Sequence, residues 1–352
     1  MTQSMPAKKS YLSELDGIRA FSILCVLAGH MLPVGPSQWQ LNSVSATTGM
    51  ALFFCLSGFL ITRFLYERPE VGAFLSRRIA RIVPLLVVYS FIFAILIKGN
   101  WSMFVAAIFF HINYIDSLLV LGSGHLWSLC LEFHFYLSIG IAIWLFGKKG
   151  FWLVPITALI VLALRIDAQA YISFRTHIRV DEILTGSMLA LIWLNQSNRY
   201  AKIAVSIFEK GFFVFAILLA IACHPEAGDI NYFRPYFAIG VLGGAIFMKE
   251  GFIKKIFRLP ILAYIAAISY ALYVWHPLTL LGWLGEGSKV EIYFIKRPIS
   301  FALTLALAHF STHTFEKYFT DLVRAKLPRL KSLHERLLTR LHNGLSHAPA
   351  HQ

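Results

Sequence analysis

The chain has 352 residues, of which 57% are hydrophobic and only 14% are charged, whereas an ordinary soluble domain carries about a quarter charged residues. With a mean hydropathy of +0.65, this composition excludes a water-soluble fold and indicates that lipid surrounds most of the chain. The net charge of +14 does not indicate nucleic-acid binding, because the basic residues lie in short loops between apolar runs and in a C-terminal tail.

Eleven apolar runs of a length that suits a membrane crossing follow one another along the chain. In chain order they are 17–35, 46–66, 82–98, 102–121, 127–146, 151–166, 181–195, 208–223, 235–249, 259–284 and 298–315. Residues 1–16 are polar and lack a small-residue cleavage site, so we expect the first run to be a retained anchor rather than a signal peptide.

The distribution of loop charge favours ten crossings over eleven. If the N-terminus is cytoplasmic and 102–121 does not cross, 24 of the 32 Lys and Arg residues lie inside and 8 lie outside; if 102–121 crosses, the counts become 15 and 17. The positive-inside rule therefore predicts an all-α integral membrane protein with about ten transmembrane helices and both termini cytoplasmic. His111, Asn113 and Asp116 suit a re-entrant or protein-buried segment at 102–121.

We expect three parts along the chain: a cytoplasmic segment at 1–10, a membrane domain at 11–320 and a basic amphipathic cytoplasmic tail at 321–352. In the tail, leucines share one helical face, which predicts a helix on the inner leaflet; a solvated flexible tail is the alternative. The cysteines lie in apolar runs and show neither disulfide nor zinc spacing, so we expect buried thiols and no metal site. They are Cys25, Cys55, Cys130 and Cys223.

The first run carries two ionisable residues, which are costly inside a membrane and are therefore candidates for function. Arg19 and His30 are eleven residues apart, so they project from one helix face, roughly 16 Å apart along the axis. This spacing suits an arginine that binds a phosphate-bearing donor near the cytoplasmic edge and a histidine base further along. A snorkelling arginine and a packing histidine are the alternative.

A cluster of arginines opens the third run. Arg77, Arg78 and Arg81 lie in FLSRRIARIVP, and the i, i+4 spacing places Arg77 and Arg81 on one face. Guanidinium groups match phosphate oxygens in a bidentate manner, which makes the cluster a candidate binding site for an anionic donor. Simple positive-inside anchoring is the alternative.

The run HLWSLCLEFHFY places three polar residues on one helix face. His125, Ser128 and Glu132 follow an i, i+3, i+7 spacing. A glutamate this deep in an apolar helix needs a histidine, an arginine or a substrate hydroxyl as its partner. A structural buried pair is the alternative.

Two later motifs carry further candidates. In RVDEILTG, Arg179 and Asp181 lie at an outer membrane edge, where an ion pair and a sugar contact are both open. SYALYVWHP aligns Ser269, Tyr273 and His276 on one face near the middle of a run. These side chains either line a polar cavity or pack in the core.

Taken together and in order, seven short motifs resemble the acyltransferase family 3 of membrane O-acetylases. They are LDGIRAFSILCVLAGH (15–30), FFCLSGFLIT (53–62), RRIARIVP (77–84), HLWSLCLE (125–132), RVDEILTG (179–186), SYALYVWHP (269–277) and FEKYF (315–319). Each motif is weak by itself, but the ordered set is specific and extends over residues 11–320.

The resemblance implies an O-acyltransferase of the bacterial inner membrane. Acyl-CoA, usually acetyl-CoA, would be the cytoplasmic co-substrate, with no tightly bound cofactor, and a carbohydrate hydroxyl on the periplasmic side would be the acceptor. By position, Arg19 and His30 become the essential pair and Glu132 a second active-site group. The donor-binding cluster would be Arg77, Arg78 and Arg81, and the substrate-binding candidates are His125, Ser128, Arg179, Asp181, Tyr273 and His276.

The chain departs from the family pattern at two places. Phe133 and His134 stand where the family often has a second acidic residue and a glutamine. Leu85 and Leu86 replace an aromatic residue that is common shortly after the position of Pro84. Both departures concern contacts with the acceptor rather than the reaction.

Two other functions compete with acyl transfer. A membrane transporter would use Arg19, His30 and Glu132 as an intramembrane path, and it would usually show an internal repeat, which we do not find. A non-catalytic membrane scaffold would tolerate the loss of His30. The sequence does not identify the acceptor, which could be O-antigen, exopolysaccharide, peptidoglycan, a lipo-oligosaccharide or a small molecule. It also does not determine the acyl chain length or the oligomeric state. Direct transfer and transfer through an acyl-histidine intermediate are both open.

Overall fold

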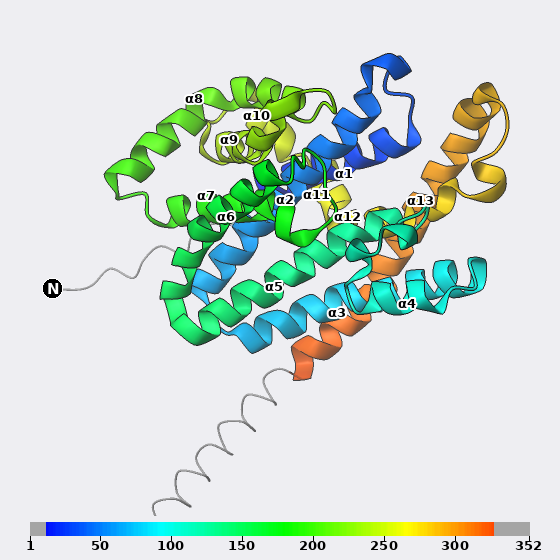
Figure 1. Ribbon diagram of the computed structural model, residues 1–352, viewed down its shortest axis with the longest axis horizontal. Helices are drawn as coiled ribbons and strands as arrows, with labels where there is room; N and C mark the ends of the chain where they lie inside the picture. Colours follow the sequence, from blue (N-terminus) through cyan, green and yellow to red (C-terminus); the bar gives the residue numbers. More distant parts are fainter. Residues whose placement is uncertain (1–11, 327–352) are drawn as a thin grey trace, which may run out of the picture.

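The computed structural model of the protein describes residues 12–326, and every regular element in that part of the chain is a helix (Figure 1). The α-helices are α1 (Glu14–Met31), α2 (Leu41–Glu67), α3 (Val71–Ser90), α4 (Trp101–Ile108), α5 (Trp127–Phe146), α6 (Leu153–Asp167), α7 (Asp181–Leu194), α8 (Arg199–Ala222), α9 (Arg234–Phe247), α10 (Phe252–Phe257), α11 (Pro260–Ala267), α12 (Ser269–Trp275) and α13 (Arg297–Phe310). Stretches of π-helix at Phe91–Ile97, Glu291–Lys296 and Ser311–Glu316 continue α3 and flank α13.

The predicted apolar runs fall on these helices with one exception. The exception is 102–121, where α4 has eight residues and is followed by short 3-10 turns. At 1.5 Å per residue α4 is about 12 Å long, far less than the ~30 Å of a hydrocarbon core, so this segment does not form a crossing helix. The run 259–284 is divided between α11 and α12, and α8 begins at Arg199, ahead of its predicted start.

Within the described residues, four helical segments are long and apolar enough to cross a membrane. They are Ser37–Glu67, Val71–Ile97, Gly124–Asp167 and Arg199–Ala222. Large apolar side chains such as Trp144, Leu159 and Phe213 are exposed on the outward faces of α5, α6 and α8. In a bilayer such faces contact lipid. The chain is therefore an all-helical membrane protein. The predicted cytoplasmic segment at 1–10, and the tail beyond residue 326, lie outside the described residues.

Helix α1 carries the candidate residues Arg19 and His30, and it packs against several other helices. It packs against α2 on one side and against α11 and α12 on another, while α2 also packs against α7. Two glycines permit the close approach of α2 and α7: a Cβ atom on Gly186 would collide with the carbonyl oxygen of Cys55, and one on Gly58 with that of Ile183. Helices α8 and α9 pack together at one end of the molecule (Figure 1).

Candidate active site

A cavity of about 380 Å³ opens beside the C-terminal end of α1. His30 borders it, together with residues of α2, of the turn before α5, of the segment 172–174 and of the end of α12. The wall is mostly apolar and aromatic, with Met50, Trp127 and Phe174 among its members. Among the described residues that line the cavity, Arg179 is the one with a permanent charge. This composition suits a small polar ring that stacks on aromatic side chains.

His30 meets a second histidine at the edge of this cavity. Its Nδ1 atom lies 2.9 Å from Nε2 of His276, and the planes of the two rings are nearly parallel, with their centroids 5.1 Å apart and an interplanar angle of 7°. The other nitrogen of His276, Nδ1, lies 2.8 Å from the carbonyl oxygen of Tyr273. His276 is buried, whereas His30 is exposed toward the cavity. The fold thus brings together α1 and the end of α12, which are far apart in the chain.

A hydrogen-bonded group behind the histidine pair contains three further predicted residues. The hydroxyl of Tyr273 donates to the carbonyl oxygen of His125 at 2.7 Å, and Ser128 donates to the Tyr273 hydroxyl at 2.7 Å. His125 is buried and lines the cavity, and no side chain among the described residues hydrogen-bonds to its ring nitrogens, although the backbone of Val274 lies close. A buried polar group with few partners is costly, so His125 is a candidate contact for a ligand.

Glu132 lies one helical turn beyond Ser128 on α5, beside a small cavity of about 20 Å³. Ser57 of α2 donates a hydrogen bond of 2.6 Å to its Oε1 atom. Tyr136, one turn further along α5, is also a hydrogen-bond partner of Glu132. Met50 and Tyr273 line both this small cavity and the larger one, so these two side chains lie between the chambers.

Arg19 is in the cluster around Glu132, three turns before His30 on α1. Its guanidinium is close enough to interact electrostatically with Arg81 and Arg78 and with the carboxylates of Asp16 and Glu132. Arg78 lies over the ring of Tyr136, 5.3 Å from its centroid. Within the described part of the chain, no carboxylate lies within ion-pair distance of Arg78 or Arg81, although Glu132 and Glu316 are near.

The three arginines of α3 have different neighbours. Arg77 lies over the ring of Phe64, 5.2 Å from its centroid, and is not among the residues whose charges act on Arg19. The arginines that do act on Arg19 are Arg78 and Arg81, which are three residues apart. Of the three predicted arginines, Arg78 and Arg81 thus lie near Arg19, whereas Arg77 lies against Phe64.

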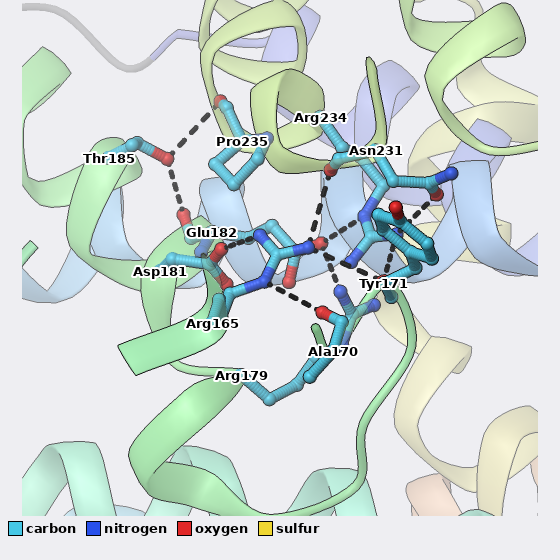
Figure 2. A network of polar contacts seen from close by, with 10 residues as sticks. All are labelled: Arg165, Ala170, Tyr171, Arg179, Asp181, Glu182, Thr185, Asn231, Arg234 and Pro235. Carbon is cyan, nitrogen blue, oxygen red and sulfur yellow. Dashed lines mark hydrogen bonds and ion pairs between the residues drawn. The ribbon is translucent and has the colours of Figure 1, made fainter. Parts of the chain in front are cut away.

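Arg179 and Asp181 belong to a buried ion network, and they do not pair with each other (Figure 2). Asp181 pairs with Arg165, while Nη1 of Arg179 lies 2.7 Å from Oε1 of Glu182. Nε of Arg234 lies 2.8 Å from the same oxygen of Glu182. Asp181 is enclosed in the network and does not line the large cavity, whereas Arg179 does. Three arginines and two carboxylates thus form one connected group behind the cavity wall.

The residues that depart from the family pattern lie away from the cavity. Phe133 stacks on Phe110 with centroids 3.9 Å apart, and Nδ1 of His134 lies 2.8 Å from Oγ1 of Thr176. Leu85 and Leu86 are buried in the apolar core. One turn further along α3, Tyr89 supplies an aromatic ring that packs edge-on against His125, with centroids 5.2 Å apart.

Sequence reasoning missed several residues of this site. Ser57 lies inside a quoted motif, but a serine in an apolar helix commonly bonds to a carbonyl of its own helix, as Ser22 does to Ile18 at 2.8 Å. Nothing in its spacing distinguishes it from such a serine. Tyr89 could have been found as the nearest aromatic residue after Pro84 on the same helix.

Comparisons with known proteins agree on one family. The acyltransferase-domain family matches residues 12–311. A protein of Staphylococcus aureus (strain COL) named "Putative O-acetyltransferase SACOL0978" is 27% identical over 361 residues, which cover 89% of this chain and 58% of that protein. The O-acetyltransferase OatA of Staphylococcus aureus (strain NCTC 8325 / PS 47) is 25% identical over 311 residues, covering 76% of this chain and 50% of OatA. The chain thus spans between half and three fifths of these relatives' lengths, and no solved structure matches it.

Proposed function

The chain belongs to the acyltransferase 3 family, and from this membership we propose that it is an O-acyltransferase that moves an acetyl or related acyl group from cytoplasmic acyl-CoA to a carbohydrate hydroxyl. Acyl-CoA is a co-substrate in this proposal, and the acceptor is a cell-surface or secreted glycan at the periplasmic side of the inner membrane. The charge distribution of the loops supports ten crossings with both termini cytoplasmic. In that orientation the Arg19 end of α1 is inside and the His30 end is outside.

The arginine cluster is the proposed donor end. Arg19, Arg78 and Arg81 gather near Glu132, with Asp16 and Glu316 also close, and neither Arg78 nor Arg81 has a carboxylate within ion-pair distance among residues 12–326. Phosphate groups of coenzyme A carry the matching negative charge, and guanidinium forks bind phosphate oxygens with strong charge-assisted hydrogen bonds. Glu132, which accepts a hydrogen bond from Ser57, would keep the arginine side chains in position for the donor.

The larger cavity is the proposed acceptor end. Its volume of about 380 Å³ accommodates a sugar unit, and the aromatic side chains of Trp127 and Phe174 form part of its wall. His30, His125 and Arg179 supply polar contacts along its wall. Met50 and Tyr273 separate this chamber from Glu132, so the thioester reaches the acceptor only when these side chains move apart.

The reaction itself needs one base. In the direct mechanism, Nε2 of His30 takes the proton of the acceptor hydroxyl while the hydroxyl oxygen bonds to the thioester carbonyl carbon. The carbon–sulfur bond then breaks, and the coenzyme A thiolate receives the proton from Nε2 of His30 and leaves as the thiol. In the alternative, Nε2 of His30 bonds to the thioester carbon and the carbon–sulfur bond breaks, so that coenzyme A leaves as the thiolate; the acceptor hydroxyl then attacks the acyl-histidine, the imidazole leaves, and the hydroxyl proton neutralises the thiolate.

One observation carries the proposal: α1 bears both the arginine in the cationic cluster and the histidine at the cavity. The helix is continuous from Glu14 to Met31, so Arg19 and His30 are rigidly held about 16 Å apart along its axis. A rigid helix that links an anion-binding end to a base-bearing end suits a reaction whose substrates arrive from opposite sides of a membrane.

The test is deletion of the gene followed by mass spectrometry of the surface glycans. We expect the mutant to lose the mass of one acetyl group per modified site, and wild-type protein to restore it. His30→Ala at an equal membrane level should not restore it, whereas His313→Ala should, because His313 is exposed and bonds to the His309 carbonyl of its own helix. Unchanged glycans in the deletion mutant, with a solute that crosses the membrane unmodified, would support a transporter instead.

A further inference from the structure

We propose that His276 is a positioning residue that fixes the tautomer of His30, so that the nitrogen left free for proton transfer is Nε2. This inference rests on the proposed function, in which His30 takes the proton of the acceptor hydroxyl. It concerns the chain of contacts that runs from the Tyr273 carbonyl through His276 to His30. No part of the reaction described above assigns a role to His276.

The first step of the argument is the Tyr273 carbonyl. A carbonyl oxygen accepts hydrogen bonds and cannot donate them. Because Nδ1 of His276 lies 2.8 Å from this oxygen, Nδ1 must carry the proton. The neutral imidazole of His276 then has its lone pair on Nε2.

The second step follows from the contact between the two rings. Nε2 of His276 lies 2.9 Å from Nδ1 of His30, and a lone pair on one atom requires a proton on the other. Nδ1 of His30 therefore donates, and the lone pair of the neutral His30 ring is on Nε2. Nε2 of His30 makes no hydrogen bond to any residue between 12 and 326, and the ring borders the cavity. The opposite tautomer of His30 would place two lone pairs face to face.

The third step separates the roles of the two histidines. Both nitrogens of His276 are engaged, and its ring is 1% exposed. It packs against the rings of His125 and Tyr273, with centroid distances of 5.6 and 5.7 Å. His276 is therefore held in place but offers no free nitrogen to a substrate. His30 has a free nitrogen and faces the cavity, so His30 is the base and His276 orients it.

The contact remains favourable after proton transfer. When Nε2 of His30 takes the acceptor proton, the ring becomes an imidazolium that carries a proton on both nitrogens. The Nδ1 proton still points at the lone pair of His276, so the hydrogen bond becomes charge-assisted. The arrangement is analogous to a catalytic triad in which a buried group holds the base in one tautomer, with a second histidine here in place of the usual carboxylate.

Two substitutions that differ by one methylene group test the inference. In His276→Gln, the amide oxygen reaches the former position of Nε2 and can accept the proton of His30 Nδ1. In His276→Asn, the amide ends near the former position of Nδ1, so it can donate to the Tyr273 carbonyl but cannot reach His30. Both side chains are polar and smaller than histidine, so a merely structural role would give them similar effects.

The rates are measured in inverted membrane vesicles that contain the native acceptor and are supplied with isotope-labelled acetyl-CoA. We expect His276→Asn to lower kcat about 100-fold or more, because a wrong tautomer disables a histidine base. We expect His276→Gln to stay within about tenfold of wild type, since an acceptor for His30 is retained. KM for acetyl-CoA should change in neither variant, because the arginine cluster is at the other end of α1.

A double substitution separates this inference from the proposed function. In a His30→Gln background, His276→Asn should cause no further loss, because the residue on which His276 acts is absent. Equal rates for His276→Asn and His276→Gln, or an equal loss with and without His30, would overturn the positioning role while leaving the acyltransferase proposal intact. If the wild-type vesicles transfer no acetyl group, or if His30→Gln retains the wild-type rate, the proposed function itself fails.

Discussion

Ser57 of α2 donates a hydrogen bond of 2.6 Å to Glu132 of α5, and this contact joins two segments that are 75 residues apart in the chain. Glu132 is buried, so its carboxylate depends on such donors to offset the loss of water. Glu132 borders the small chamber and lies near Arg19, so the bond from Ser57 helps to fix the carboxylate beside the arginine cluster.

The first prediction concerns this bond. In Ser57→Ala the carboxylate loses a charge-assisted partner whose contribution is about 1.5–3 kcal/mol, so we expect the acyl-transfer rate to fall about tenfold or more. The matched control is Ser22→Ala, which removes a buried hydroxyl that bonds only to the Ile18 carbonyl of its own helix. Initial rates with labelled acetyl-CoA compare the two variants. Equal rates in both would show that Glu132 does not depend on Ser57.

The second prediction concerns the buried ion network of Figure 2. Glu182 accepts hydrogen bonds from both Arg179 and Arg234, and its side chain is fully buried. Glu182→Gln leaves these two guanidinium groups without a compensating charge, so we expect a loss of about 3–5 kcal/mol in the free energy of unfolding. Thermal unfolding of the purified protein in lipid nanodiscs measures this loss.

An exposed ion pair provides the control for that measurement. Arg175 and Asp116 lie 3.2 Å apart, and their side chains are 49% and 73% exposed. Asp116→Asn should therefore change the free energy of unfolding by less than about 1 kcal/mol. If Glu182→Gln is as mild as Asp116→Asn, the ion pairs of Glu182 with Arg179 and Arg234 do not contribute to the stability of the fold.

The sequence was sufficient for much of the fold, and the reason is physical. In lipid, backbone groups must bond within their own segment, so long apolar runs become helices. Runs such as 127–146 therefore coincide with helices, here α5. The same regularity made the face of α1 predictable, because a continuous helix places residues eleven apart on one side.

The sequence could not show which helices meet. His276 approaches His30 because α12 packs against α1, and no local pattern records a contact between segments 246 residues apart. The spacing grouped Arg77, Arg78 and Arg81 on one helix, but only the packing of α3 shows that Arg78 and Arg81 lie near Arg19 while Arg77 lies against Phe64. Similarly, Asp181 and Glu182 are adjacent, and only the positions of Arg165 and Arg234 show which partner each carboxylate takes.

The third prediction concerns the close approach of α2 and α7. A Cβ atom on Gly186 would collide with the backbone of Cys55, which cannot move without shifting the whole helix. We expect Gly186→Ala to destabilise the protein by about 1–3 kcal/mol or more, because overpacking forces backbone displacement. Unfolding midpoints in nanodiscs provide the measurement.

Gly72 is the matched control for this substitution. It lies in the first turn of α3, and a Cβ atom there would meet nothing within 4 Å. Gly72→Ala should be neutral or slightly stabilising, by up to about 1 kcal/mol, since alanine has the higher helix propensity. A Gly186→Ala protein as stable as the Gly72→Ala protein would mean that α2 and α7 are not in backbone contact.

The fourth prediction tests the donor end through Arg81. This residue interacts with Arg19 and Glu316 but has no carboxylate within ion-pair distance among residues 12–326. A guanidinium that is not already neutralised is available to a phosphate group of coenzyme A. Arg81→Gln should therefore raise KM for acetyl-CoA by about tenfold or more, since a hydrogen bond to a charged group contributes about 1.5–3 kcal/mol.

Arg68→Gln is the control that separates the effect of losing the Arg81 contact from the effect of losing one positive charge. Arg68 is exposed just before α3, so its replacement removes one positive charge on the same side of the protein without entering the cluster. We expect its KM for acetyl-CoA to stay close to the wild-type value, because exposed charges are screened by salt within about 10 Å. If both variants raise KM equally, the arginines attract the donor only through a diffuse field. If only Arg81→Gln raises it, the cluster binds the donor directly, and α1 then carries a donor contact at Arg19 and the base at His30.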